Sequence, residues 1–248
     1  MFAEKKAHVD LTYHELEERA KKKEWWCWSQ WFWHWVALPP TRWLLYTNIT
    51  ANQVTVFWVL LQFLAAYLML GTYWSRVMGI VLYNIVITIL DCVDGNLARA
   101  RKTESYVGIY LEQIGMFLGT PLIILAISWK VFLANGQIAY LYLAGIGSLL
   151  FLYSRLFNPN PVWFGAEKQE LMTRIYEQGS FRKKRSALGY VANIFRRGQP
   201  FNLLFFGVIL NRLEIVIIGY FASFVFEAGR KLFVTIRMLQ KAVKQPEK

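Results

Sequence analysis

The chain has 248 residues, of which 56% are hydrophobic and 18% charged, and its formal net charge is +12. An average globular protein has about half hydrophobic and about a quarter charged residues. This apolar surplus excludes a soluble globular domain, and the same composition excludes disorder, collagen and coiled coil. The basic residues form clusters between apolar runs rather than one continuous surface. We therefore expect a polytopic membrane protein and no nucleic-acid partner.

Residues 1–43 form an amphipathic segment that is rich in tryptophan. Seven of the 11 Trp residues lie between residues 25 and 43, and Trp prefers the headgroup level of a bilayer. We predict a helix over 4–43 that lies in the membrane interface, with the basic run Lys21–Lys23 against anionic headgroups. A cage of Trp side chains around a ligand is the alternative interpretation.

Long apolar runs follow Pro39 and Pro40, each near the length of about 20 residues that a membrane helix needs. The predicted fold class is an all-α integral membrane protein with six transmembrane helices preceded by an N-terminal amphipathic interfacial helix. The transmembrane domain is expected over 44–238 and a polar tail over 239–248. A tight turn at Asn211–Glu214 separates the last two spans. The predicted spans are 49–70, 75–98, 106–128, 135–156, 188–210 and 213–236.

The distribution of Lys and Arg predicts the orientation of the spans. The head, the run Arg99–Lys102, the connection that contains Arg182–Arg185 and the tail are basic. Basic loops stay on the cytoplasmic side, so both termini and the site at the end of the second span are expected to face the cytoplasm. The long connection at about 158–187 is either a solvated loop near anionic lipid or a lid over a phosphorylated substrate.

Acidic residues first reappear after the head at the end of the second predicted span. Asp91 and Asp94 are spaced i, i+3 and share a helix face, and Glu112 follows Gly108 by one turn in the third span. Carboxylates at membrane depth are costly, so they usually mark a polar cavity with a function. An all-oxygen pocket suits Mg²⁺ or Mn²⁺ together with substrate phosphates. The alternative is that salt bridges to Arg99 and Arg101 simply hold two helices together.

Two sequence motifs resemble those of a known family. Asp91-x-x-Asp94-Gly95-x-x-Ala98-Arg99, followed after eight residues by Gly108, resembles the signature of the CDP-alcohol phosphotransferases, or CDP-alcohol phosphatidyltransferases. Thr50-Ala51-Asn52-x-x-Thr55 resembles the lead-in to that family's first span, with Ala51 in place of Pro. The resemblance implies transfer of a substituted phosphate from a CDP-linked donor to an acceptor, with release of CMP, in phospholipid or lipid-linked head-group synthesis.

The resemblance also implies roles for individual residues and for partners. The expected partners are the CDP-linked donor, a lipid, alcohol or phosphate acceptor, membrane lipids and a second copy of the chain in a homodimer. Arg155, late in the fourth span, is expected to contact an acceptor phosphate, or alternatively to pair with a helix end. Asp91, Asp94 and Glu112 are the expected catalytic and Mg²⁺-binding or Mn²⁺-binding residues. The expected nucleotide-binding residues are Gly95, Ala98, Arg99, Gly108, Asn52 and Thr55. Thr50 is expected to line the same mouth, and capping of the first span is the alternative for Thr50, Asn52 and Thr55.

The sequence departs from the family signature at its last two acidic positions. Glu112 and Met116 stand where the family has Asp, and the family is thought to use the last Asp as the base on the acceptor hydroxyl. Three interpretations remain open. The base comes from Glu112, Glu227 or an acid of the 158–187 loop. Alternatively, the acceptor is already an anionic phosphate, so that a pyrophosphate link forms. The third interpretation is an inactive membrane interaction protein that binds nucleotide and metal.

Overall fold

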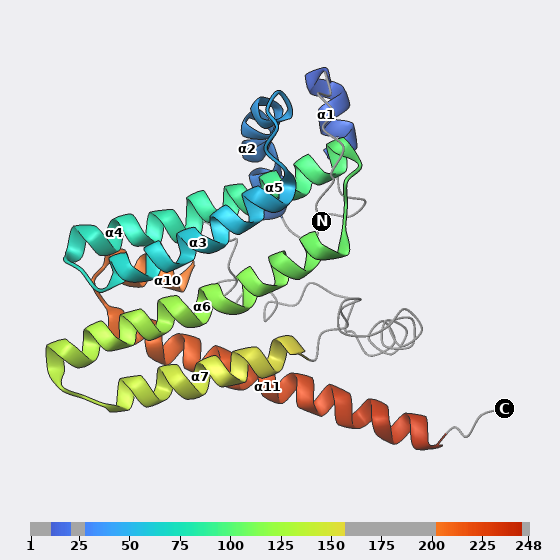
Figure 1. The fold of residues 1–248 in the computed structure, drawn as a ribbon. Coiled ribbons are helices and arrows are strands. Elements are labelled where there is room, and N and C mark those ends of the chain that lie inside the picture. Colours follow the sequence, from blue (N-terminus) through green and yellow to red (C-terminus); the bar gives the residue numbers. More distant parts are fainter. Residues whose placement is uncertain (1–10, 21–27, 157–201, 245–248) are drawn as a thin grey trace.

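Every regular element in the described part of the chain is a helix, as expected for an all-α membrane protein (Figure 1). The computed structural model describes residues 11–20, 28–156 and 202–244. Helix α3 packs on α5 and on α6, α6 packs on α7, and α7 packs on α11. The helices are α1 (Tyr13–Ala20), α2 (Trp28–Leu45), α3 (Ala51–Met69), α4 (Tyr73–Val81), α5 (Ile87–Arg101), α6 (Tyr106–Asn135), α7 (Ala139–Leu156), α10 (Leu203–Ile209) and α11 (Leu213–Lys244), with a π-helical turn η1 (Leu82–Val86).

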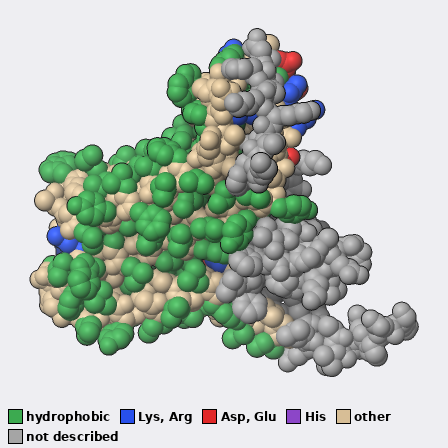
Figure 2. Space-filling model, in the orientation of Figure 1, with side chains coloured by type: hydrophobic (Ala, Val, Ile, Leu, Met, Phe, Trp, Pro, Cys, Tyr) green, Lys and Arg blue, Asp and Glu red, His purple; other side chains and the backbone are tan. Residues whose placement is uncertain are grey.

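Three of the described helices are long and apolar enough to cross a membrane: Ala51–Met69, Tyr73–Arg101 and Tyr106–Asn135. They correspond to the first three predicted spans, but the third continues to Asn135 rather than 128. Hydrophobic side chains cover much of the bundle surface (Figure 2). On α3, the exposed large apolar side chains include those of Phe57, Leu60, Phe63, Leu64 and Tyr67.

The later predicted spans agree only in part with the helices. Helix α7 begins at Ala139, because Gly136 ends α6 in the left-handed conformation that suits glycine there (φ 69°). Most of the predicted span 188–210 lies outside the described residues, and α10 covers only its end. Helix α11 extends to Lys244, beyond the predicted end at 236 and into the segment expected to be a polar tail. The count of six spans stays a prediction.

A turn at residues 210–212 joins α10 to α11, so the turn predicted at Asn211–Glu214 begins one residue earlier and ends before Leu213. Asn211 has a left-handed backbone (φ 54°), and its Oδ1 accepts a hydrogen bond of 2.6 Å from Nη2 of the buried Arg76. The hydroxyl of Tyr73 donates to the carbonyl of Ile209. These bonds hold the α10–α11 turn against the start of α4.

The second long helix contains the π-helical turn η1, which brings one extra residue into the turn and so changes the face on which α5 places its side chains. Asn84 lies in this turn and is buried. Its amide pairs reciprocally with that of Asn202, with N···O distances of 3.0 and 3.3 Å. Asn202 also caps α10 by accepting from the backbone N–H of Phe205. The π turn is therefore held by the start of α10.

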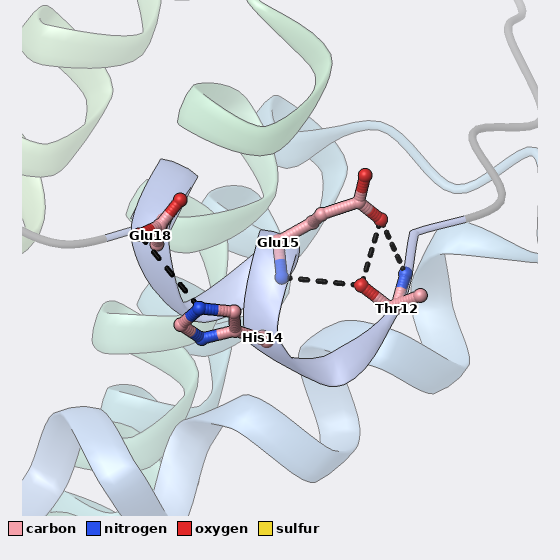
Figure 3. Close-up of polar contacts among 4 residues, drawn as sticks. All are labelled: Thr12, His14, Glu15 and Glu18. Carbon is pink, nitrogen blue, oxygen red and sulfur yellow. Dashed lines mark hydrogen bonds and ion pairs between the residues drawn. The ribbon is translucent and has the colours of Figure 1, made fainter.

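In the described residues of the head, α1 and α2 overlap the predicted helix over 4–43, and most of the rest of that prediction lies outside the described residues. Helix α1 starts with a capping box, because Glu15 accepts from Thr12 while its own N–H donates to the Thr12 hydroxyl (Figure 3). Two hydrogen bonds from Thr12 lower the pKa of Glu15. The bond from the hydroxyl has the larger effect, and the bond from the backbone N–H has the smaller effect. On the same helix, the exposed side chains of His14 and Glu18 lie one helical turn apart and approach one another (Figure 3).

Helix α2 contains Pro39 and Pro40 and ends at Leu45, two residues beyond the predicted end of the head segment. Its buried positions recur every three or four residues, and this face packs on α5. Trp43 is 68% exposed, whereas Trp33 is buried. The position of α2 relative to a bilayer stays a prediction. The buried stripe consists of Trp33, His34, Ala37, Leu38, Thr41, Leu44 and Leu45.

Arg101, the last residue of α5, attaches the end of α2 to the bundle. Its Nη2 donates to the carbonyls of Leu44 (2.9 Å) and Thr47 (2.8 Å), and its Nη1 donates to that of Ile49 (2.5 Å). Carbonyls at a helix end lack intrahelical partners, so one guanidinium satisfies several of them at once. A lysine ammonium lacks this planar fork.

We therefore expect Arg101→Lys to lower the free energy of unfolding by about 2 kcal/mol, the scale of a hydrogen bond to a charged group. Thermal melting in detergent and hydrogen exchange of α2 measure the effect. The matched control is Arg42→Lys, because Arg42 is exposed on α2. Equal melting and equal exchange of the two variants would contradict this role of Arg101.

Candidate active site

Asp94 is a buried carboxylate on α5 that faces α3, since both of its hydrogen-bond donors come from that helix. It is 6% exposed. Its Oδ2 accepts from the hydroxyl of Thr55 at 2.6 Å and from the indole Nε1 of Trp58 at 2.7 Å. The first span, from which the sequence predicted only contacts with the nucleotide, therefore donates two hydrogen bonds to a carboxylate of the predicted metal site.

Asp91 and Glu112 approach Asp94 from two helices. Both carboxylates lie within electrostatic range of Asp94, and both residues are half-buried. Helices α5 and α6 each pack extensively on α3, whereas their contact with one another is slight. In the part of the chain that the structure describes, no three His, Cys, Asp or Glu side chains stand close enough to hold a metal ion by themselves. The three acids therefore share one region without forming a closed cage.

Arg99 connects the signature segment to the head. Its Nε donates to the carbonyl of Ala20, the last residue of α1, at 2.9 Å, and its Nη2 donates to Oδ1 of Asn96 at 2.8 Å. A Cβ added at Gly95 would lie 3.3 Å from Nη1 of Arg99, so this guanidinium lies beside the missing side chain. The sequence did not indicate the contact with Ala20. Ala98 is half-buried against the hydrophobic core.

The first turns of α3 and α6 meet at two of the predicted nucleotide-binding residues. A Cβ added at Gly108 would lie 2.9 Å from Oδ1 of Asn52. Ser105 caps α6 by accepting from the N–H of Gly108. Thr50 forms a capping box with Gln53 at the start of α3, so of Thr50, Asn52 and Thr55 it is Thr50 that has the alternative capping role.

Met116 occupies a half-buried position on α6 immediately after Gly115. Of the acids considered as replacements for the missing base, Glu112 lies in the same region as Asp94. Glu227 lies on α11 and forms an ion pair with Lys231 at 3.5 Å. The 158–187 loop lies outside the described residues.

Arg155 lies in the last turn of α7, with its guanidinium carbon 4.9 Å from the centre of the Phe151 ring. Lys231 of α11, which is 7% exposed, donates to the carbonyl of Ser154 beside it. A buried lysine next to Arg155 was not expected from the sequence, because α11 comes about 75 residues later in the chain. Trp58 was also missed, since it looked like one more apolar residue of the first span.

Residues 48–158 match the profile of the CDP-alcohol phosphatidyltransferase family. The matched range contains α3, α5, α6 and α7, and with them Asp91, Asp94, Glu112 and the predicted nucleotide-binding residues. A comparison with curated proteins found no match. Transferases of this family generally depend on a divalent metal. Through this segment, the chain is similar to the CDP-alcohol phosphatidyltransferase family.

Proposed function

We propose that the chain transfers a substituted phosphate from a CDP-linked donor to an acceptor and releases CMP. The observation that carries this proposal is the buried carboxylate of Asp94, held by two donors from α3, with Asp91 and Glu112 within electrostatic range. These acids lie within residues 48–158, the segment that matches the model of a transferase family. Buried acids that repel one another are unfavourable unless a cationic ligand offsets the repulsion.

The donor chemistry of these acids fits a divalent cation that arrives with its substrate. Mg²⁺ usually binds one or two carboxylates together with substrate phosphates and waters, rather than a cage made of protein ligands alone. The absence of a closed cluster of three ligands among the described side chains is compatible with this mode. Asp91, Asp94 and Glu112 would hold the cation, and Mn²⁺ would serve in place of Mg²⁺. When bound, the metal would neutralise charge on the pyrophosphate and on departing CMP.

The nucleotide is expected to contact the residues around the first turns of α3 and α6 and the end of α5. Gly95 and Gly108 offer close backbone approach, because neither carries a side chain. Arg99 would bind a phosphate or ribose oxygen while its Nε keeps the carbonyl of Ala20. The proposed nucleotide-binding set is Gly95, Ala98, Arg99, Gly108, Asn52 and Thr55.

The acceptor determines whether a base is needed. An uncharged alcohol must lose a proton, and Glu112 is the proposed base because it lies within electrostatic range of Asp94. A phosphate acceptor needs no base, and the neighbouring Arg155 and buried Lys231 favour such an anionic acceptor as the second candidate. We place the site and both termini on the cytoplasmic side, where basic segments remain. A homodimer stays a prediction from the resemblance.

The direct test is release of CMP by purified protein in lipid vesicles with Mg²⁺, a panel of CDP-linked donors, and alcohol or phosphate acceptors. We expect Asp94→Asn to reduce turnover by more than about 100-fold, because loss of a ligand should exceed the about 10- to 100-fold loss typical of an outer partner. The matched control, Glu214→Gln, changes an acid at the start of α11 and should leave turnover intact. Absence of CMP release by the wild-type protein with every donor and acceptor would contradict the proposal.

Introducing an acid at position 116 tests whether the missing Asp limits removal of the proton from an alcohol acceptor. A positioned general base typically contributes about 10²- to 10⁴-fold. We expect Met116→Asp to raise transfer to an uncharged alcohol by at least about 10-fold and to leave transfer to a phosphate acceptor unchanged. Met116→Asn is the matched control, because it has the same shape as Asp without a basic carboxylate. If the Asp and Asn variants have equal alcohol-transfer rates, the missing acid does not limit the reaction.

A further inference from the structure

Trp58 is buried between the two helices that carry the acids of the proposed site. Its side chain is fully buried, and its Nε1 lies 2.7 Å from Oδ2 of Asp94 on α5. The far edge of the same indole lies over Gly115 on α6. A Cβ added there would be 2.1 Å from Cη2 and 2.3 Å from Cζ3 of Trp58. One side chain of α3 thus spans from the Asp94 carboxylate to the backbone of α6.

The space for this indole depends on glycine at position 115. Any larger residue would place a Cβ inside the ring, and a rigid indole has no flexible end that could move aside. Gly115 follows Glu112 by three residues and directly precedes Met116. The contact therefore lies beside the part of α6 where the chain departs from the family signature.

The hydrogen bond of Trp58 acts on one particular oxygen of Asp94. The indole N–H can only donate, so Trp58 does not bind a cation through nitrogen and does not remove a proton. Both donors from α3 use Oδ2. A carboxylate held at one oxygen by two donors on a rigid helix has a fixed orientation, and its Oδ1 is then presented in a constant direction. A tryptophan needed only for packing would not require a carboxylate partner for its N–H, since a backbone carbonyl would serve.

We propose that Trp58 is a positioning residue for Asp94, which fixes the carboxylate so that Oδ1 faces the divalent cation accompanying the CDP-linked donor. This inference rests on the proposed function. Thr55 shares the task from the preceding turn of α3. Outer partners that orient metal-binding carboxylates typically affect metal affinity or activity by about 10- to 100-fold.

The main test is Mn²⁺ binding to the full-length protein in lipid nanodiscs in the presence of CDP, measured by electron paramagnetic resonance. Trp58→Phe keeps an aromatic ring and removes the N–H, and we expect it to weaken Mn²⁺ binding by about 10-fold or more. Thr55→Val should weaken binding in the same direction. Trp74→Phe is the matched control. Trp74 is 72% exposed and lies near the start of the long helix Tyr73–Arg101, whereas Asp94 lies near its end. Wild-type affinity in Trp58→Phe would overturn the inference.

A second measurement follows the indole N–H of Trp58 directly and needs no metal binding by the Trp58→Phe variant. In protein labelled with ¹⁵N-tryptophan, the indole N–H resonance that is missing from Trp58→Phe identifies Trp58. We expect Asp94→Asn to shift this resonance upfield, since a neutral amide accepts a weaker hydrogen bond than a carboxylate. The resonance of Trp74 should stay in place. An unmoved Trp58 resonance would overturn the inference.

Failure of this inference and failure of the proposed function give different results. If the wild-type protein releases CMP and Trp58→Phe has the same Mg²⁺ dependence, the positioning role is wrong and the function stands. If the wild-type protein binds Mn²⁺ more tightly than Trp58→Phe but releases no CMP, the positioning role is supported and the proposed reaction is wrong. Absence of Mn²⁺ binding by the wild-type protein in the presence of CDP would overturn both.

Discussion

The arrangement of the candidate site depends on the pair of hydrogen bonds that α3 donates to Asp94. A buried carboxylate without partners costs several kcal/mol in an apolar interior, so its helix can pack only where donors are provided. Thr55 and Trp58 provide them from one face of α3. Trp58 in turn requires the close approach of α6 that Gly115 allows. The carboxylate, the indole and the glycine therefore fix the positions of α3, α5 and α6 together.

Local patterns in the sequence predicted the first three spans and the acids of the site. Hydropathy is a property of neighbouring residues, so the predicted span 49–70 lies close to Ala51–Met69. The contacts that were missed join distant residues. Trp58 bonds an acid 36 positions away, and the π turn is held by an amide pair 118 positions apart. Neither pairing leaves a periodic trace in the sequence.

The two arginines after the acids link the candidate site to the head of the chain. Arg99 bonds the final carbonyl of α1, and Arg101 bonds carbonyls around the end of α2. Both interactions satisfy backbone groups that a helix end leaves open. The head helices therefore contact the end of α5 that carries the candidate site, and their role as an interfacial anchor stays a prediction.

We propose that the acids of α5 and α6 bind a divalent cation together with a CDP group. An experimental structure of the protein with CDP and Mn²⁺, with the ion located by anomalous scattering, tests this most directly. We expect the ion to contact Oδ1 of Asp94 and a phosphate oxygen of CDP, with Trp58 still bonded to Oδ2. A nucleotide bound elsewhere, or an ion remote from Asp91, Asp94 and Glu112, would contradict the account.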